Sequence, residues 1–165
     1  MRLYAWQGPG IFEVSFVELG ADRLTARGIQ LRADYSLSYA VETSGMFVSE
    51  HLRAEVETLD GSRTLDLSRG TTPLKDDVLD LDLEASPLFN SLPVLRDRLH
   101  EGGDAREYTM AFVGVPDLSL TRSTQRYVPL GRRVVRFRSG TFTTDLEFDA
   151  DGFVVRYPGL AERVS

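Results

Sequence analysis

The stretch that decides the fold is residues 80–99, which read DLDLEASPLFNSLPVLRDRL. In its first part leucine alternates with aspartate or glutamate, and this period of two is typical of a β-strand. In its second part apolar residues recur at the spacing of a helix face, at Leu88, Leu92, Leu95 and Leu99. The stretch therefore predicts a strand followed by a helix near 88–101, and we expect this to be the one substantial helix of the protein.

Residues that favour the start of a helix are concentrated in the middle of this stretch. Ser86, which precedes a proline, can cap a first helical turn. Asn90 or Ser91 can cap the main helix with Pro93 in its first turn, where the backbone N–H groups have no intrahelical partner. The glycine pair at 102–103 predicts the end of the helix.

Most of the remaining chain shows strand periodicity. Residues 11–19 carry Phe12, Val14 and Phe16 on one face, and residues 106–116 are apolar on both faces, so neither face of the second strand is expected to be fully solvated. Many long strands with one helix predict a mainly β protein with a curved antiparallel sheet, a roll or a partial barrel. Where the helix does not fill the concave side, an apolar pocket remains as a candidate ligand site.

Two parts of the sequence show a weak internal similarity, which we call the internal echo. Residues 56–61 (VETLDG) and 147–152 (EFDADG) both end in Asp-Gly and both precede an apolar-polar strand. Two similar half-domains would explain this echo, and two unrelated Asp-Gly hairpins would explain it equally well.

Length and composition suit one domain that spans residues 1–165. The absence of cysteine excludes a thiol nucleophile and a thiolate metal site, and the two histidines lie far apart, so the sequence predicts no metal site and no cofactor. The net charge of −6 argues against binding to nucleic acid. No apolar stretch has the length of a signal or membrane-spanning segment, so we expect a soluble protein of the bacterial cytoplasm without integral membrane association.

Three sets of residues are candidates for chemistry. Asp80 and Asp82 share one strand face and either form an acid–base pair or lie in solvent or beside arginines. Asn90 either caps the helix or, with the first-turn N–H groups, holds a polar headgroup. Six arginines in the second half either bind phosphate or sugar or pair with acidic neighbours on the sheet surface, at Arg122, Arg126, Arg132, Arg133, Arg136 and Arg138.

Five pieces of the sequence form an ordered pattern over nearly the whole chain. They are residues 80–83 (DLDL), 86–97 (SPLFNSLPVLRD), 111–118 (AFVGVPDL), 125–127 (QRY) and 157–160 (YPGL). In this order they resemble the family of bacterial proteins named putative glycolipid-binding. The resemblance implies a fold like that of the bacterial lipoprotein carriers, a strongly curved antiparallel sheet (β-roll or half-barrel) around an apolar cavity with a helical cover. It implies a glycolipid ligand only through the family name, which rests on fold analogy.

Three positions depart from the pattern of this family. Phe89 replaces a threonine, Leu95 replaces an arginine and Asp97 replaces a leucine. A pair of arginines is thereby reduced to Arg96, which weakens any bidentate hold on an anionic headgroup. We therefore expect a site that is more apolar than is usual in the family.

The leading hypothesis is non-enzymatic binding of an amphipathic small molecule, glycolipid-like or fatty-acyl-like, in an apolar cavity of the curved sheet. Apolar strand faces and the inner helix face would hold its apolar part. A polar set near the mouth of the cavity would hold its headgroup, with no residue assigned a catalytic role: Asp82, Asn90, Arg96, Gln125 and Tyr127.

Two alternatives come from other functional classes. A hydrolase-like enzyme acting on a sugar or lipid would use Asp80 or Asp82 as its base, and it requires one of these carboxyls in a cleft with a raised pKa. A protein-interaction module would instead use an exposed sheet edge. The sequence does not indicate which oligomeric state the protein adopts.

Overall fold

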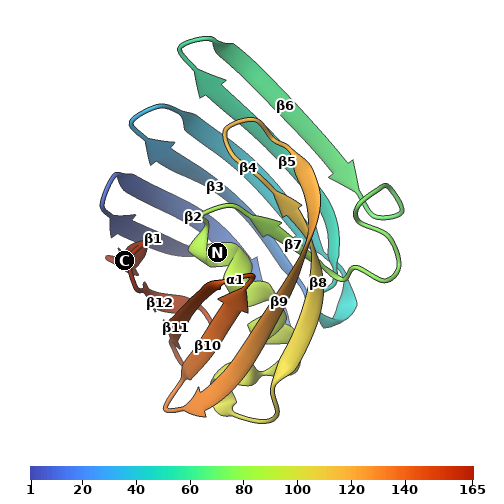
Figure 1. Ribbon diagram of the computed structural model, residues 1–165, viewed down its shortest axis with the longest axis vertical. Helices are drawn as coiled ribbons and strands as arrows, with labels where there is room; N and C mark the ends of the chain where they lie inside the picture. The colour runs from blue at the N-terminus through green and yellow to red at the C-terminus, as the bar shows by residue number, and fades with distance from the viewer.

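The computed structural model describes residues 1–165, which form mainly β-strands in one curved, open sheet (Figure 1). The strands are β1 (Arg2–Gly8), β2 (Ile11–Leu19), β3 (Leu24–Arg32), β4 (Ser36–Thr43), β5 (Ser49–Thr58), β6 (Gly61–Ser68), β7 (Asp80–Leu83), β8 (Arg106–Val113), β9 (Leu120–Gly131), β10 (Val134–Ser139), β11 (Phe142–Phe148), β12 (Val154–Tyr157) and β13 (Ala161–Arg163). The helices are α1 (Pro87–Asp97) and the short 3-10 turns η1 (Gly45–Phe47) and η2 (Leu99–Glu101). The predicted mainly β class, with one substantial helix and a sheet of the β-roll or half-barrel type, is confirmed.

The sheet consists of two meanders joined at a seam. Strands β1 to β6 are neighbours in space in the order of the sequence, and so are strands β8 to β13. The seam is the antiparallel pair of β1 and β13, in which Trp6 lies opposite Arg163. Trp6 is fully buried, and its indole Nε1 donates a hydrogen bond of 2.8 Å to the carbonyl oxygen of Val154. This bond fixes β1 against the second meander.

Strand β7 departs from the predicted antiparallel arrangement because it pairs in parallel with β8. Parallel neighbours need a crossover connection, and α1 provides it. The same strand is also tied to the first meander by Ser49. The Ser49 backbone N–H donates to the carbonyl oxygen of Leu79 at 2.8 Å, and the Leu81 N–H donates to Ser49 Oγ at 3.1 Å. The sheet therefore curls until its β7 edge meets the start of β5.

Helix α1 begins earlier than the sequence predicts. Ser86 is its N-cap and Pro87 its first residue, so the two predicted helical segments are one helix. Asn90 and Ser91 lie inside it, and their predicted role as caps is wrong. Arg98 ends the helix in a left-handed conformation, with a φ of 53° and its N–H bonded to the Val94 carbonyl. No helix has the length and apolar character needed to cross a bilayer.

The helix lies between two apolar clusters. Leu88 and Leu92 join a cluster with the inner faces of β1 to β6, whereas Val94 joins a smaller cluster with the inner faces of β9 to β12. Each face of β8 carries a buried residue, since Ala111 belongs to the first cluster and Met110 to the second. This confirms the expectation that neither face of that strand is fully solvated.

The two Asp-Gly turns that echo each other in sequence do not occupy equivalent places in the meanders. Asp60-Gly61 leads from the fifth to the sixth strand of the first meander. Asp151-Gly152 leads from the fourth to the fifth strand of the second. This difference favours two unrelated hairpins as the origin of the echo.

Candidate functional site

A cavity of about 500 Å³ lies between the start of α1 and the inner face of the second meander. The segment 82–85 forms one wall, and β8, β9, β10 and the turn between β12 and β13 contribute the others. Seven of the 14 residues that line it are hydrophobic. This volume falls within the range of pockets that bind small molecules.

The polar end of the cavity is built from side chains that form one hydrogen-bonded chain. Asn90 Nδ2 donates to Tyr127 Oη at 3.0 Å, and the Tyr127 hydroxyl donates to Gln125 Oε1 at 3.2 Å. Gln125 Nε2 in turn donates to Asp82 Oδ2 at 2.5 Å. Residues from α1, β9 and β7 are therefore fixed relative to one another. The other oxygens, Asp82 Oδ1 and Asn90 Oδ1, receive no hydrogen bond from the protein.

Asp82 has no positively charged partner. The pKa of its carboxyl is raised to about 7, mainly by burial and to a lesser extent by the negative charges of Glu84 and Asp80, against the lowering effect of the hydrogen bond from Gln125. Near neutral pH this group therefore exists in both protonation states. A carboxyl with this pKa in a cavity is able to accept or donate a proton.

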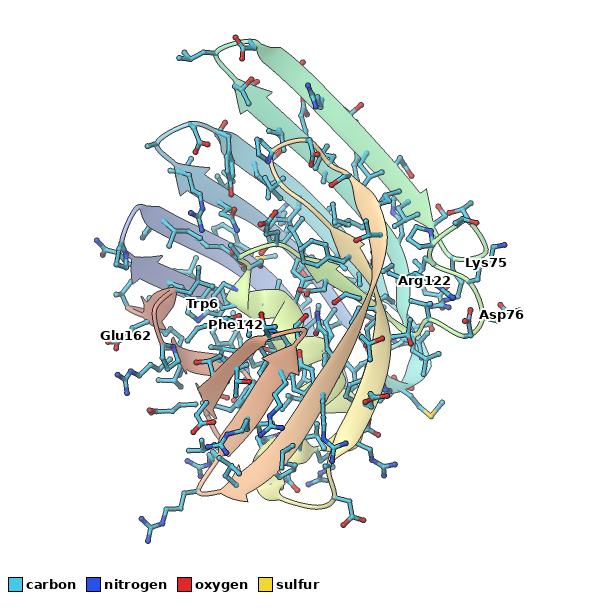
Figure 2. All side chains as sticks on the ribbon, viewed as in Figure 1. Trp6, Lys75, Asp76, Arg122, Phe142 and Glu162 are labelled. Carbon is cyan, nitrogen blue, oxygen red and sulfur yellow. The ribbon has the colours of Figure 1, made fainter.

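Aromatic side chains form the rim of the cavity. Phe137, Phe142 and Tyr157 contact one another, with ring centroids 6.1 to 6.4 Å apart. Phe142 stands at the turn between β10 and β11, where Figure 2 labels it, and it is 48% exposed. Asn90 is 4% exposed and Gln125 is 1% exposed. Phe137 is itself only 4% exposed, so Phe142 is the most exposed ring, and the cavity runs from Phe142 at the surface to the buried Asn90 and Gln125.

The structure brings four of the five predicted site residues together. Asp82, Asn90 and Gln125 line the cavity, and Tyr127 lies behind them, fully buried, as the link between Asn90 and Gln125. Arg96 is not among them. Six residues separate it from Asn90, which places it roughly 240° away around the helix axis.

Arg96 is instead committed to Asp80. Its Nη1 and Nη2 donate to the two Asp80 carboxylate oxygens at 2.6 and 2.7 Å, and its guanidinium lies 5.1 Å from the centre of the Tyr108 ring. Asp80 is 1% exposed, so this is a buried bidentate ion pair. The two aspartates share a strand face as predicted, but one is paired with a cation and the other faces the cavity.

The departures from the family pattern at Phe89 and Leu95 do not make this cavity more apolar. Neither residue lines it. Phe89 is 1% exposed and packs edge-to-face on Tyr39, with ring centroids 5.4 Å apart, because it points roughly 100° away from Asn90 around the helix. Leu95 lies near the far end of α1. These two positions therefore do not alter this cavity, whereas Leu95 lines a separate pocket together with Arg96 and Asp97, and the expectation of a more apolar site stays a prediction.

A second buried polar cluster was missed by sequence reasoning. Glu13 is fully buried, and its Oε1 accepts hydrogen bonds from the hydroxyls of Ser86 at 2.7 Å and Tyr39 at 2.8 Å. Burial raises the pKa of Glu13 to about 7. Gln30 Nε2 bonds both Glu13 and the Glu84 carbonyl, at 3.3 Å each, which holds the cavity wall against the first meander. The sequence feature that could have indicated its burial is that Glu13 shares a strand face with Ile11 and Ser15, opposite the phenylalanines.

Comparison with solved structures gives a relative of the same fold. A crystal structure of a DUF1089 family protein from Pseudomonas aeruginosa aligns with a TM-score of 0.76 and 24% identity, over 99% of this chain and 100% of that one. A search of curated proteins returned no match. Residues 5–163 match the family described as "Putative glycolipid-binding". Because the match covers nearly the whole sequence, the chain belongs to this family.

Proposed function

We propose that residues 1–165 form one domain that binds an amphipathic small molecule in the cavity beside α1 and does not convert it chemically. The observation that carries this proposal is the combination, in one cavity of about 500 Å³, of the buried side chains of Asn90 and Gln125 with aromatic side chains that reach the surface at Phe142. The headgroup would face Asp82 and Asn90, and the apolar part would lie against Phe137 and Phe142. Each buried methylene contributes about 0.8 kcal/mol. The family description supports a lipid-like ligand that carries a sugar.

The predicted polar set divides into three roles under this proposal. Asp82, Asn90 and Gln125 contact the headgroup, because their side chains line the cavity. Tyr127 is a positioning residue that holds Asn90 and Gln125 in place. Arg96 acts at a distance, since its ion pair with Asp80 fixes α1 against β7.

A matched pair of variants on one strand tests the proposal. Ser139 lines the cavity, whereas its neighbour Arg138 is exposed on the opposite face of β10. Ser139→Trp fills the cavity and is expected to abolish binding of decyl glucoside in a calorimetric titration, while Arg138→Trp leaves it unchanged. Mass spectrometry of organic extracts from the purified protein should also recover an amphiphile from the wild type. A protein that yields no amphiphile, and that binds decyl glucoside no better than Ser139→Trp does, contradicts the proposal.

One observation favours the hydrolase-like alternative. Asp82 meets the condition set for it, namely a carboxyl in a cleft with a pKa raised to about 7, whereas Asp80 is locked to an arginine. Incubation with decyl glucoside or a decanoyl ester, followed by quantification of free glucose or decanoate, separates the two functions. Release that disappears in Asp82→Asn identifies an enzyme, and recovery of intact ligand identifies a binding protein.

The two sheet edges give the protein-interaction alternative little support. The β7 edge is occupied by the hydrogen bonds to Ser49. The β6 edge is polar over most of its length, with Arg63 and Asp66 among its exposed residues. Charged residues on an edge strand oppose pairing with another chain.

A further inference from the structure

The charges around the cavity all have one sign. Asp82 and Glu84 contribute carboxyls, and none of the 14 lining residues is lysine, arginine or histidine. Arg96 is paired with Asp80 and Arg136 with Asp145 at 2.7 Å. Arg32, whose buried Nε has no partner, does not line the cavity. The field inside the cavity therefore opposes phosphate, sulfate and carboxylate groups and favours a cation.

Two oxygen atoms of the hydrogen-bonded chain have no protein donor, and both belong to residues that line the cavity. Asp82 Oδ1 and Asn90 Oδ1 receive no hydrogen bond from a protein donor. Asn90 is only 4% exposed, so it is 96% buried. The hydrogen-bonded chain aims one N–H of Asn90 and one of Gln125 at protein oxygens. A protonated primary amine supplies three strong donors from one atom, which suits a site whose free polar atoms are acceptors.

The aromatic rim is suited to the same ligand. Phe137, Phe142 and Tyr157 line the same cavity as Asp82, and the faces of aromatic rings attract cations. Their edges and faces also contact the carbon atoms next to an ammonium group. Rim and buried end thus select for positive charge through independent interactions.

We propose that the cavity recognises an amphiphile whose headgroup carries a protonated amine, with the ammonium group between Asp82 and Asn90 and its neighbouring carbons against the aromatic rim. This inference rests on the proposed binding function and names the headgroup class for that same cavity. An amine headgroup distinguishes this ligand class from anionic lipids and from lipids that carry a neutral sugar without an amine.

Three probes with one tail test the headgroup class. Decylamine, decyl glucoside and decyl phosphate are titrated calorimetrically at pH 8, below their micelle concentrations. A charge-assisted hydrogen bond in a partly buried site predicts that decylamine binds roughly tenfold or more tighter than decyl glucoside, with decyl phosphate weakest. Decylamine that binds no tighter than decyl glucoside overturns the inference and leaves the binding function intact. Absence of binding by all three probes counts against both.

Two variants and a control locate the effect. Asp82→Asn should weaken decylamine binding roughly tenfold to a hundredfold while affinity for decyl glucoside is kept. Asp76→Asn removes the same charge from the exposed loop between β6 and β7, distant from Phe142 in Figure 2, and should change nothing. Phe142→Ala alters only an exposed rim residue, so the fold is retained, and it should weaken decylamine severalfold. Wild-type affinity in both Asp82→Asn and Phe142→Ala overturns the inference.

The pH dependence of decylamine binding provides a further test. The titratable groups around Asp82 are Asp80, Glu84, Tyr127 and Tyr157, which are carboxyls and phenols and therefore carry no positive charge. Because Asp82 loses its proton around pH 7, decylamine binding should tighten between pH 6 and pH 8. Decyl glucoside binding should change little. Equal pH dependence for the two probes contradicts the inference.

Discussion

The two sides of α1 differ in how completely they are packed. Toward the first meander, Leu88, Phe89 and Leu92 are at most 1% exposed and belong to one continuous apolar cluster. Toward the second meander, Asn90 faces a cavity because β9 and β10 present Gln125 and Ser139 there instead of large apolar side chains. The comparison teaches that tight packing on one side anchors the helix, so the other side remains hollow without loss of the fold.

The largest effect expected from this comparison is on stability. Phe89→Ala opens a void in the packed side and should lower the free energy of unfolding by about 3–5 kcal/mol. Phe142→Ala removes the same ring from the hollow side, where it is half exposed, and should cost less than about 0.5 kcal/mol. Urea denaturation of both variants measures the difference. Equal losses would show that the two sides contribute alike.

The ion pair at the far end of the helix gives the next largest effect. Arg96→Met leaves Asp80 buried without a counter-ion and should destabilise the protein by about 3 kcal/mol at pH 8. The loss should shrink in acid, because a neutral Asp80 needs no counter-ion. Asp80→Asn combined with Arg96→Met should recover most of the stability. A single variant as stable as the wild type would contradict this view of the pair.

The Glu13 cluster predicts a pH dependence of stability. Its pKa is about 7 in the folded protein against 4.5 for the ordinary carboxyl, so between these values the unfolded chain has released a proton that the folded state retains. Stability is therefore full below pH 4.5 and is lost as the pH rises to 7, by about 1.4 kcal/mol per pH unit for this group. Glu13→Gln should remove that slope from a series of denaturation curves. Asp82 titrates in the same window, so part of the total slope persists.

An exposed residue on the same strand supplies the control for this series. Glu18→Gln changes the same functional group in solvent and should leave the slope unaltered. A Glu13→Gln protein with the wild-type slope would mean that this carboxyl is already ionised at low pH in the folded state.

The smallest effect concerns Asp82 and has the opposite sign to that of Arg96. Asp82→Asn removes a partly buried charge that has no counter-ion, so it should raise the free energy of unfolding of the ligand-free protein by about 1 kcal/mol at pH 8. Asp76→Asn should give no change in the same denaturation experiment. A loss of stability in Asp82→Asn would show that its hydrogen bond from Gln125 outweighs the cost of the charge.

Local patterns in the sequence predicted the strand-to-helix switch, the mainly β class and that neither face of β8 is fully solvated. They did not predict the start of α1, because Ser86 with Pro87 and Asn90 with Pro93 are both acceptable starts and only the fold selects the first. They also left open which face of β2 lies inside. Phe12 and Phe16 lie on the outer face, and Glu13 lies inside because its partners, up to 73 residues away in sequence, are invisible to a local pattern.

The candidate site, like the fold, was predicted only in part. Asp82, Asn90 and Gln125 were named through the family resemblance and converge on one cavity, although nothing in their spacing requires it. Arg96 was named with them, yet helix geometry turns it away. The aromatic rim was not predicted, because Phe137, Phe142 and Tyr157 come from three different strands whose register only the structure supplies.

The seam between β1 and β13 has a consequence for how the protein is made. A ribosome synthesises Trp6 near the beginning of this sequence and Arg163 near its end, yet these residues are neighbours in the middle of the sheet. The sheet therefore cannot become continuous until residue 163 has been added. Contacts so distant along the chain slow folding, and until then β1 is an unpaired edge of the nascent first meander.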